Sequence, residues 1–154
     1  MMPLTHLNYP LDKDRLLVLA DSIKDKANPY TDSRYPDAVL DTWLILKHTD
    51  DYIEKIMDDF GVVGSPRFYW QEPNSVLPMH VDNNTTCSIN FVLTDNPAPV
   101  TVEDVDYVYE QAVLDTTRLH GVNTNDEERI LLKISIFDES YEDLVKRIPF
   151  IKGE

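Results

Sequence analysis

The sequence contains a single cysteine, Cys87, among its 154 residues. One thiol excludes an intrachain disulfide and a structural zinc site built from several cysteines. No run of about 18 apolar residues occurs, so we expect no membrane-spanning helix. The first residues, Met-Met-Pro-Leu-Thr-His, lack the basic and apolar regions of a secretory signal, and a cytoplasmic location is therefore expected.

Basic residues are also scarce. The chain has 14 lysines and arginines against 28 aspartates and glutamates, which gives a formal net charge of −14. Nucleic-acid backbones and anionic membranes are bound through Lys and Arg, so this charge argues against both partners. The simplest interpretation of the acidic excess is a well-solvated surface, and attraction to a cationic partner is the alternative.

The remaining composition is that of a folded globular protein, with 42% apolar and 27% charged residues and a length that suits one domain. Periodicity divides this domain into three parts. Residues 1–65 are predicted to form a helical support region, residues 66–137 a strand-rich core, and residues 138–154 a closing helix and tail. The predicted fold class is therefore mainly β with N-terminal helices.

Three helices are predicted in the first part. Apolar residues recur at helical spacing over residues 11–27 and again over residues 36–46. A third helix is predicted to begin after Thr49 or Asp50, either of which can cap its first turn. Its predicted end is Gly61, because glycine accepts the left-handed conformation that terminates many helices.

Short alternating segments fill the second part, which is typical of a β-sandwich or barrel. The last segment, residues 129–137, has Ile and Leu at its even-numbered positions, and we expect this face to lie beneath the N-terminal helices. The alternate residues from Arg129 to Ser135 then face the other way. The other predicted strands are residues 67–70, 87–93, 100–102, 107–109 and 112–114.

The segment His80-Val81-Asp82 is the most informative fragment. On a strand, residues two apart point to the same side, so the His80 imidazole and the Asp82 carboxylate can aim at one point. His120 would complete a set of two histidines and one carboxylate if the fold brings it there. Such a facial triad leaves coordination positions open and is typical of non-haem Fe(II) oxygenases.

Arg129 begins the last predicted strand, on the side opposite the Ile and Leu stripe. A buried guanidinium is costly without an anion, and a carboxylate that accepts two parallel hydrogen bonds is its natural partner. An ion pair with Glu127 or Glu128 is the alternative.

The order His80-x-Asp82, His120 and Arg129 resembles that of the Fe(II)/2-oxoglutarate-dependent dioxygenases, in particular their prolyl-hydroxylase-like branch. The resemblance covers roughly residues 66–137 and includes Tyr69, which precedes the motif as an aromatic does in that branch. It implies a double-stranded β-helix, a jelly roll with helices packed on its larger sheet.

The resemblance also implies the chemistry. His80, Asp82 and His120 would ligate Fe(II), and Arg129 would bind the distal carboxylate of 2-oxoglutarate. Tyr69 is a further candidate contact for this co-substrate, with a core aromatic as the alternative. The implied reaction converts 2-oxoglutarate and O₂ to succinate and CO₂ and hydroxylates a protein residue or a small metabolite. Ascorbate is a candidate reductant.

Two positions depart from the family's common patterns. Leu131 stands where certain branches place a serine that helps to grip the carboxylate, and Tyr69 or Ser135 could supply that hydroxyl instead. Lys133 shares the inner face with Arg129. We expect the strand to bend so that Lys133 reaches solvent, and a second contact with the 2-oxoglutarate carboxylate is the alternative.

Two other functions compete with the oxygenase. A cupin-like metalloenzyme that does not use 2-oxoglutarate would share the jelly roll and the histidine ligands, but it would leave Arg129 without a role. A non-catalytic jelly-roll binding module would bind neither Fe(II) nor 2-oxoglutarate. The identity of the substrate and the oligomeric state do not follow from the sequence.

Overall fold

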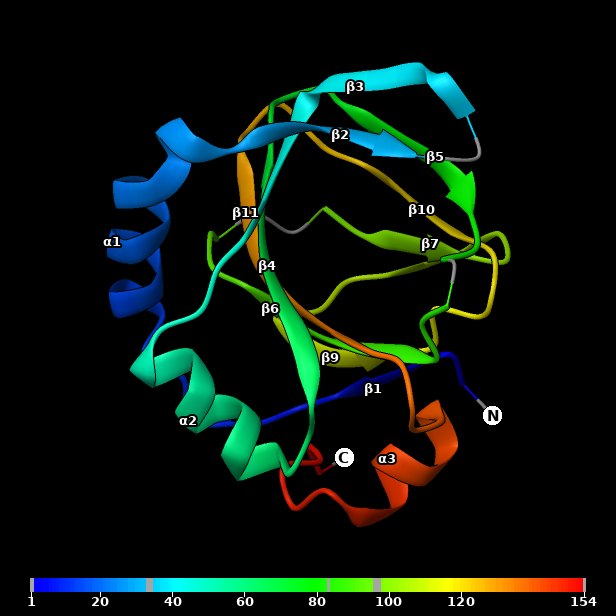
Figure 1. Ribbon diagram of the computed structural model, residues 1–154. Coiled ribbons are helices and arrows are strands. Elements are labelled where there is room, and N and C mark those ends of the chain that lie inside the picture. The colour runs from blue at the N-terminus through cyan, green and yellow to red at the C-terminus, as the bar shows by residue number, and fades with distance from the viewer. Residues whose placement is uncertain (1, 33–34, 83, 96–97, 154) are drawn as a thin grey trace.

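The computed structural model describes residues 2–32, 35–82, 84–95 and 98–153 (Figure 1). For residues 31, 32 and 35–42 it describes the backbone alone. Within these ranges the strands form two antiparallel sheets. The larger sheet contains, in spatial order, β1 (Leu4–His6), β9 (Gln111–Leu114), β6 (Cys87–Val92), β11 (Arg129–Ile136), β4 (Gly64–Gln71), β3 (Tyr35–Lys47) and β2 (Asn28–Asp32). The smaller sheet contains β5 (Val76–His80), β10 (His120–Asn123), β7 (Val100–Val102) and β8 (Val105–Tyr107).

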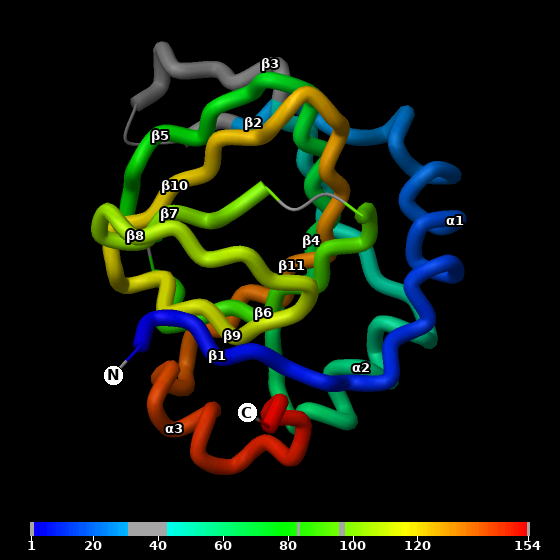
Figure 2. Tube along the Cα trace, turned by 180° about the vertical axis from the view of Figure 1, so that it is seen from behind, coloured from blue at the N-terminus to red at the C-terminus, as the bar shows by residue number. Residues whose placement is uncertain are grey.

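From β4 to β11 the chain passes repeatedly between the two sheets. Strands β4, β6, β9 and β11 belong to the larger sheet, and β5, β7, β8 and β10 belong to the smaller one, which lies in front in Figure 2. Sheets connected in this way make a double-stranded β-helix, so the predicted jelly roll is confirmed. Strands β1, β2 and β3 extend the larger sheet at its two edges.

The α-helices in the described ranges are α1 (Lys13–Ile23), α2 (Asp51–Phe60) and α3 (Tyr141–Arg147), and a short 3-10 helix, η1 (Lys24–Lys26), continues α1. Side-chain oxygens cap their first turns: those of Asp12, Asp50 and Ser140 accept hydrogen bonds from backbone N–H groups. Gly61 ends α2 with φ of 64°, as predicted. No helix in the described ranges has the length and apolar character needed to cross a bilayer.

Helices α1 and α2 cover the outer face of the larger sheet (Figure 1). The even-numbered residues of β11 pack there against buried helical residues such as Leu16, Ile53 and Phe60, as predicted. We call this apolar layer the outer cluster. The inner cluster lies on the opposite face of the larger sheet and includes Trp43, Tyr69, Leu131 and Val122.

The helix predicted over residues 36–46 is wrong, because this segment belongs to β3. Leu44 and Leu46 pack against the outer cluster, whereas Trp43 and Ile45 belong to the inner layer. A strand with apolar neighbours on both faces has a nearly continuous apolar sequence, which periodicity alone does not distinguish from a buried helix.

Candidate metal centre and its pocket

Two strands of the smaller sheet place the two histidines of the predicted triad. His80 is the last residue of β5, His120 is the first residue of β10, and the two are direct partners in the antiparallel register. Their ring centroids lie 4.4 Å apart. Both side chains are buried, so the pairing of β5 with β10 fixes the separation of the two imidazoles.

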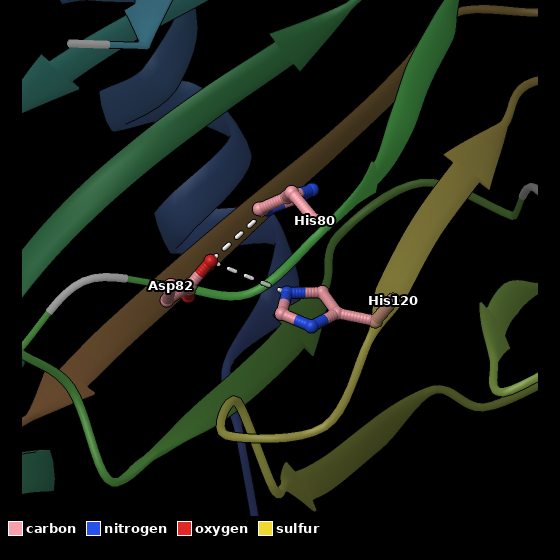
Figure 3. A group of neighbouring side chains, drawn as sticks. All are labelled: His80, Asp82 and His120. Carbon is pink, nitrogen blue, oxygen red and sulfur yellow. Dashed lines mark ion pairs between the residues drawn. The ribbon is translucent and has the colours of Figure 1, made fainter. Parts of the chain in front are cut away.

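Asp82 completes the triad, but it does not lie on a strand with His80 as predicted. It follows the end of β5, and its backbone N–H is 3.3 Å from the carbonyl oxygen of Thr116. Its Oδ1 atom lies 3.0 Å from Nε2 of His80 and 3.3 Å from Nε2 of His120, as the dashed lines in Figure 3 mark. The candidate ligand atoms of the three residues all lie within 4.8 Å of one another.

Backbone carbonyls orient both imidazole rings. Nδ1 of His80 lies 2.8 Å from the Pro78 carbonyl oxygen, and Nδ1 of His120 lies 2.7 Å from the Arg118 carbonyl oxygen. A carbonyl oxygen only accepts hydrogen bonds, so each Nδ1 carries the proton and donates. Each Nε2 then faces Oδ1 of Asp82 and is the ring nitrogen that would bind a metal held between the three side chains, which is how metal-binding histidines are commonly oriented.

Lys133 does not reach solvent, so that prediction is wrong. Its Nζ donates to Oδ2 of Asp82 at 2.9 Å, and its side chain is 15% exposed. Burial alone would raise the pKa of Asp82, but the Lys133 ammonium and the two histidines hold it well below its usual range. Burial likewise opposes the charge on Lys133, but Tyr69 and Asp82 hold its pKa above the ordinary value.

Arg129 lies on the inner face of β11 and is 1% exposed. Its Nη1 donates to Oε1 of Gln71 at 2.9 Å, whereas its Nε and Nη2 are buried without a hydrogen-bond partner among the described residues. The alternative ion pair with Glu127 or Glu128 is not formed, and Glu128 instead pairs with Lys24 at 2.8 Å.

Tyr69 is both a core residue and a pocket residue. It is 7% exposed, packs edge-on against Trp43 with ring centroids 6.5 Å apart, and belongs to the inner cluster. It also lines the pocket and lies opposite Leu131 in the register of β4 and β11. Its position on β4 is two residues from Gln71, the partner of Arg129.

These residues line one pocket of about 640 Å³, which contains the triad, Arg129, Tyr69 and Lys133. The lining residues that sequence reasoning missed include three long polar side chains, those of Lys47, Arg67 and Gln71. Alternation along β4 could have found two of them, because Arg67, Tyr69 and Gln71 must share one face. Lys47 lay beyond the segment that was wrongly predicted to be a helix.

Comparison with known proteins reveals similarity only at the level of structure. No protein-family model and no curated protein matches the sequence. A prolyl hydroxylase from Trichoplax adhaerens, solved with a fragment of hypoxia inducible factor, is similar over 94% of this chain and 86% of its own (TM-score 0.69, 10% identity). A prolyl-4-hydroxylase from Pseudomonas putida is similar over 88% and 92% (TM-score 0.67, 14% identity).

A third similar structure is the viral collagen prolyl hydroxylase of Paramecium Bursaria Chlorella virus-1, solved as a 2-oxoglutarate complex. It covers 87% of this chain and 94% of its own, with a TM-score of 0.59 and 9% identity. The likeness to prolyl hydroxylases is thereby confirmed as a likeness of fold. One fold supports many reactions, so the function must be argued from the site.

Proposed function

We propose that the protein is an Fe(II)/2-oxoglutarate-dependent oxygenase that hydroxylates its substrate. The proposal depends on the environment of the Arg129 side chain. Its guanidinium is buried in the pocket of the triad, and two of its nitrogens, Nε and Nη2, have no hydrogen-bond partner among the described residues. A buried cation of this kind is costly unless an anion completes it, and a carboxylate fits the guanidinium fork.

The donor set of the triad fits a divalent iron ion. Two neutral imidazole nitrogens and one carboxylate oxygen would hold the metal and leave further positions for a co-substrate. Lys133 occupies Oδ2 of Asp82, which leaves Oδ1 for the metal. When bound, Fe(II) would supply the one-electron and O₂ chemistry that protein side chains lack.

The pocket also offers a site for 2-oxoglutarate. Nε and Nη2 of Arg129 would donate to its distal carboxylate, and Gln71 would keep the guanidinium in place through Nη1. In the register of β4 and β11, Tyr69 lies between the levels of Arg129 and Lys133 on the inner face. Its hydroxyl is therefore a candidate second donor to the 2-oxoglutarate carboxylate. In the overall reaction 2-oxoglutarate, which loses CO₂, and the substrate each provide two electrons to O₂, and one oxygen atom enters succinate while the other enters the substrate.

The cupin-like alternative receives less support from the same geometry. A metalloenzyme that does not use 2-oxoglutarate would leave the two unpartnered guanidinium nitrogens of Arg129 without an anion. A binding module without metal would bring together two buried imidazoles and a carboxylate with no ligand to hold.

The test is succinate formation from 2-oxoglutarate by the purified protein with Fe(II), ascorbate and air, without added substrate. We expect slow turnover by the wild type and by His6→Ala, which removes an exposed histidine outside the site. His80→Ala should give none while its circular dichroism stays that of a folded protein. Absence of succinate, together with no binding of 2-oxoglutarate to the anaerobic Fe(II) protein, would reject the proposal.

A further inference from the structure

Three basic residues occupy neighbouring positions on the inner face of the larger sheet. Lys47 of β3 lies opposite Arg67 of β4, and Arg67 lies opposite Lys133 of β11. Figure 1 shows these three strands side by side. Directly opposite residues of adjacent strands point to the same face, and all three side chains line the pocket. We call these three residues the basic row.

Only one member of the basic row has an acidic partner in the described part of the chain. Lys133 pairs with Asp82, whereas the side chains of Lys47 and Arg67 make neither an ion pair nor a hydrogen bond there. Arg67 is half-buried and Lys47 is exposed. Because Lys47 and Arg67 have no acidic partner there, the basic row leaves uncompensated positive charge beside the metal site. Like charges directly opposite on adjacent strands also destabilise a sheet.

The sign of the pocket is opposite to that of the whole chain. Acidic residues outnumber basic ones by 28 to 14 overall. Among the described residues that line the pocket, however, the basic ones are Lys47, Arg67, Arg129 and Lys133, and the acidic one is Asp82. The net charge of −14 therefore gives no advantage to a cationic ligand inside the pocket, where the local charges favour an anion.

The basic row is separate from the position of Arg129. Strands in a sheet are about 4.8 Å apart, which puts the backbone of Arg67 about 5 Å and that of Lys47 about 10 Å from Lys133. Arg129 lies four residues along β11 from Lys133, or about 14 Å at the rise of an antiparallel strand. A co-substrate that extends from the triad to Arg129 along the strand leaves Arg67 and Lys47, which lie across the strands, for another ligand.

We propose that Arg67 and Lys47 bind an anionic group, a carboxylate or a phosphate, of a small-molecule substrate and hold that substrate beside the metal site. Arg67 would supply two parallel hydrogen bonds, and the exposed Lys47 would supply a point charge. A volume of about 640 Å³ is in the range of small-molecule sites. The assignment of the bound molecule as the substrate rests on the proposed function, but the anion site itself does not.

The first test uses inorganic phosphate and acetate as probes, because they represent the two candidate anions. Each is titrated into ¹⁵N-labelled full-length protein loaded with Zn(II) and 2-oxoglutarate, and ¹H–¹⁵N correlation spectra are recorded. We expect saturable shifts at amides of β3 and β4 around Lys47 and Arg67. The anion that binds more tightly then identifies the group carried by the substrate.

Variants assign this binding to the basic row. Arg67→Gln should weaken it about tenfold, Arg67→Lys less, and Lys47→Gln less than Arg67→Gln. Lys26→Gln makes the same charge change at an exposed position outside the pocket and should bind like the wild type. Wild-type protein that binds neither anion, or Arg67→Gln and Lys47→Gln that both bind like Lys26→Gln, would overturn the proposal.

A parallel titration with 2-oxoglutarate separates this proposal from the proposed function. Arg67→Gln should bind 2-oxoglutarate within about twofold of the wild type. If its affinity for 2-oxoglutarate falls as much as that for phosphate or acetate, the basic row is the co-substrate site and the inference is wrong. If neither the wild type nor any variant binds 2-oxoglutarate but anion binding still depends on Arg67, the oxygenase proposal fails and the anion site stands.

A final assay asks whether the bound anion belongs to a substrate. Small carboxylates, each beside its uncharged methyl ester, and phosphate monoesters, each beside its uncharged dimethyl triester, are added to the succinate assay. Wild type should be stimulated by charged compounds over their esters, and Arg67→Gln should lose this preference. Stimulation of the wild type by the uncharged esters alone would overturn the assignment.

Discussion

The two carboxylate oxygens of Asp82 have different partners. Oδ1 faces the two histidines and Oδ2 accepts from Lys133. Lys133 therefore fixes the rotation of the carboxylate without being a metal ligand itself, and it compensates the charge of Asp82 in the absence of a metal. The triad is thus prepared by one side chain and two backbone carbonyls, since the latter hold the imidazole rings.

Arg129→Lys should weaken 2-oxoglutarate binding by about tenfold or more, because lysine keeps the charge but loses the planar fork. Zn(II) affinity should stay within about twofold, since Arg129 contacts none of the three candidate ligands. Isothermal titration of the Zn(II) protein with 2-oxoglutarate, and of the metal-free protein with Zn(II), measures both. Arg15→Lys, at an exposed position on α1, is the matched control. An equal loss of both affinities would contradict the role of Arg129.

Cys87 should be unreactive in the folded protein. Its thiol is buried in the outer cluster, and burial raises its pKa from 9.0 to about 11. Alkylation by iodoacetamide at pH 8 should therefore be slow and should become fast in urea. Because the folded-state pKa is raised, the thiol contributes stability that is lost as pH rises from 9.0 to about 11. Urea unfolding of Cys87→Ala should lack this part of the pH dependence, and an identical alkaline loss in both proteins would contradict it.

At this scale the sequence identifies residues better than it identifies their partners. The spacing of His80, Asp82, His120 and Arg129, with the resemblance, selects four residues that the structure brings into one pocket. The bonds from Lys133 to Asp82 and from Gln71 to Arg129 could not be predicted. They depend on the register of β11 with β4 and on the course of the chain after β5, and both are set by tertiary packing.

Among the elements, β3 shows where periodicity fails and β11 shows where it succeeds. β11 has buried neighbours on both faces, but its inner face includes Arg129, Lys133 and Ser135, so polar residues interrupt the apolar pattern. In β3 the run from Trp43 to Leu46 is apolar on both faces, and helix and strand templates fit it equally well. The pairing of β3 with β4 and with β2 decides between them.

The contact between β5 and β10 makes Gly121 sensitive to substitution. A Cβ atom at this position would lie 2.7 Å from the backbone oxygen of Leu77 and 3.0 Å from Sδ of Met79. Gly121→Ala must therefore push β10 away from β5 and change the distance between His80 and His120. We expect a loss of about 1–3 kcal/mol in the free energy of unfolding and a roughly tenfold loss of Zn(II) affinity.

Gly153→Ala is the control for that change, because a Cβ at Gly153 meets no atom within 4 Å. Urea unfolding and Zn(II) titration of the two variants and the wild type provide the comparison. If Gly121→Ala is destabilised but binds Zn(II) like Gly153→Ala, then the pairing of β5 with β10 does not set the geometry of the triad.

In the whole molecule, stability and chemistry occupy different layers. The outer cluster between the helices and the larger sheet contains the large apolar side chains of α1, α2 and β11. The inner layer contains the pocket with its desolvated imidazoles, carboxylate and ammonium. Because buried charges and unpartnered N–H groups cost free energy, the inner layer should destabilise the fold until ligands complete it.

Metal binding should therefore raise the melting temperature through this one site. At a free Mn(II) concentration of about 100 times Kd, a ligand that binds only the folded state stabilises it by about 2.7 kcal/mol. For a chain of 154 residues this corresponds to a rise of about 5–10 °C. Differential scanning calorimetry under nitrogen, in about 0.15 M salt to screen the net charge of −14, measures the shift.

Histidine variants distinguish Mn(II) binding at the triad from Mn(II) binding at the acidic surface. His120→Ala should show little or no rise, because one of the three candidate ligands is lost, while His6→Ala should respond like the wild type. Addition of 2-oxoglutarate should raise the melting temperature further in wild type with Mn(II) but not in Arg129→Lys. An equal rise in wild type and His120→Ala would mean that Mn(II) binds to surface carboxylates, and the triad would then lose its assignment as the metal centre.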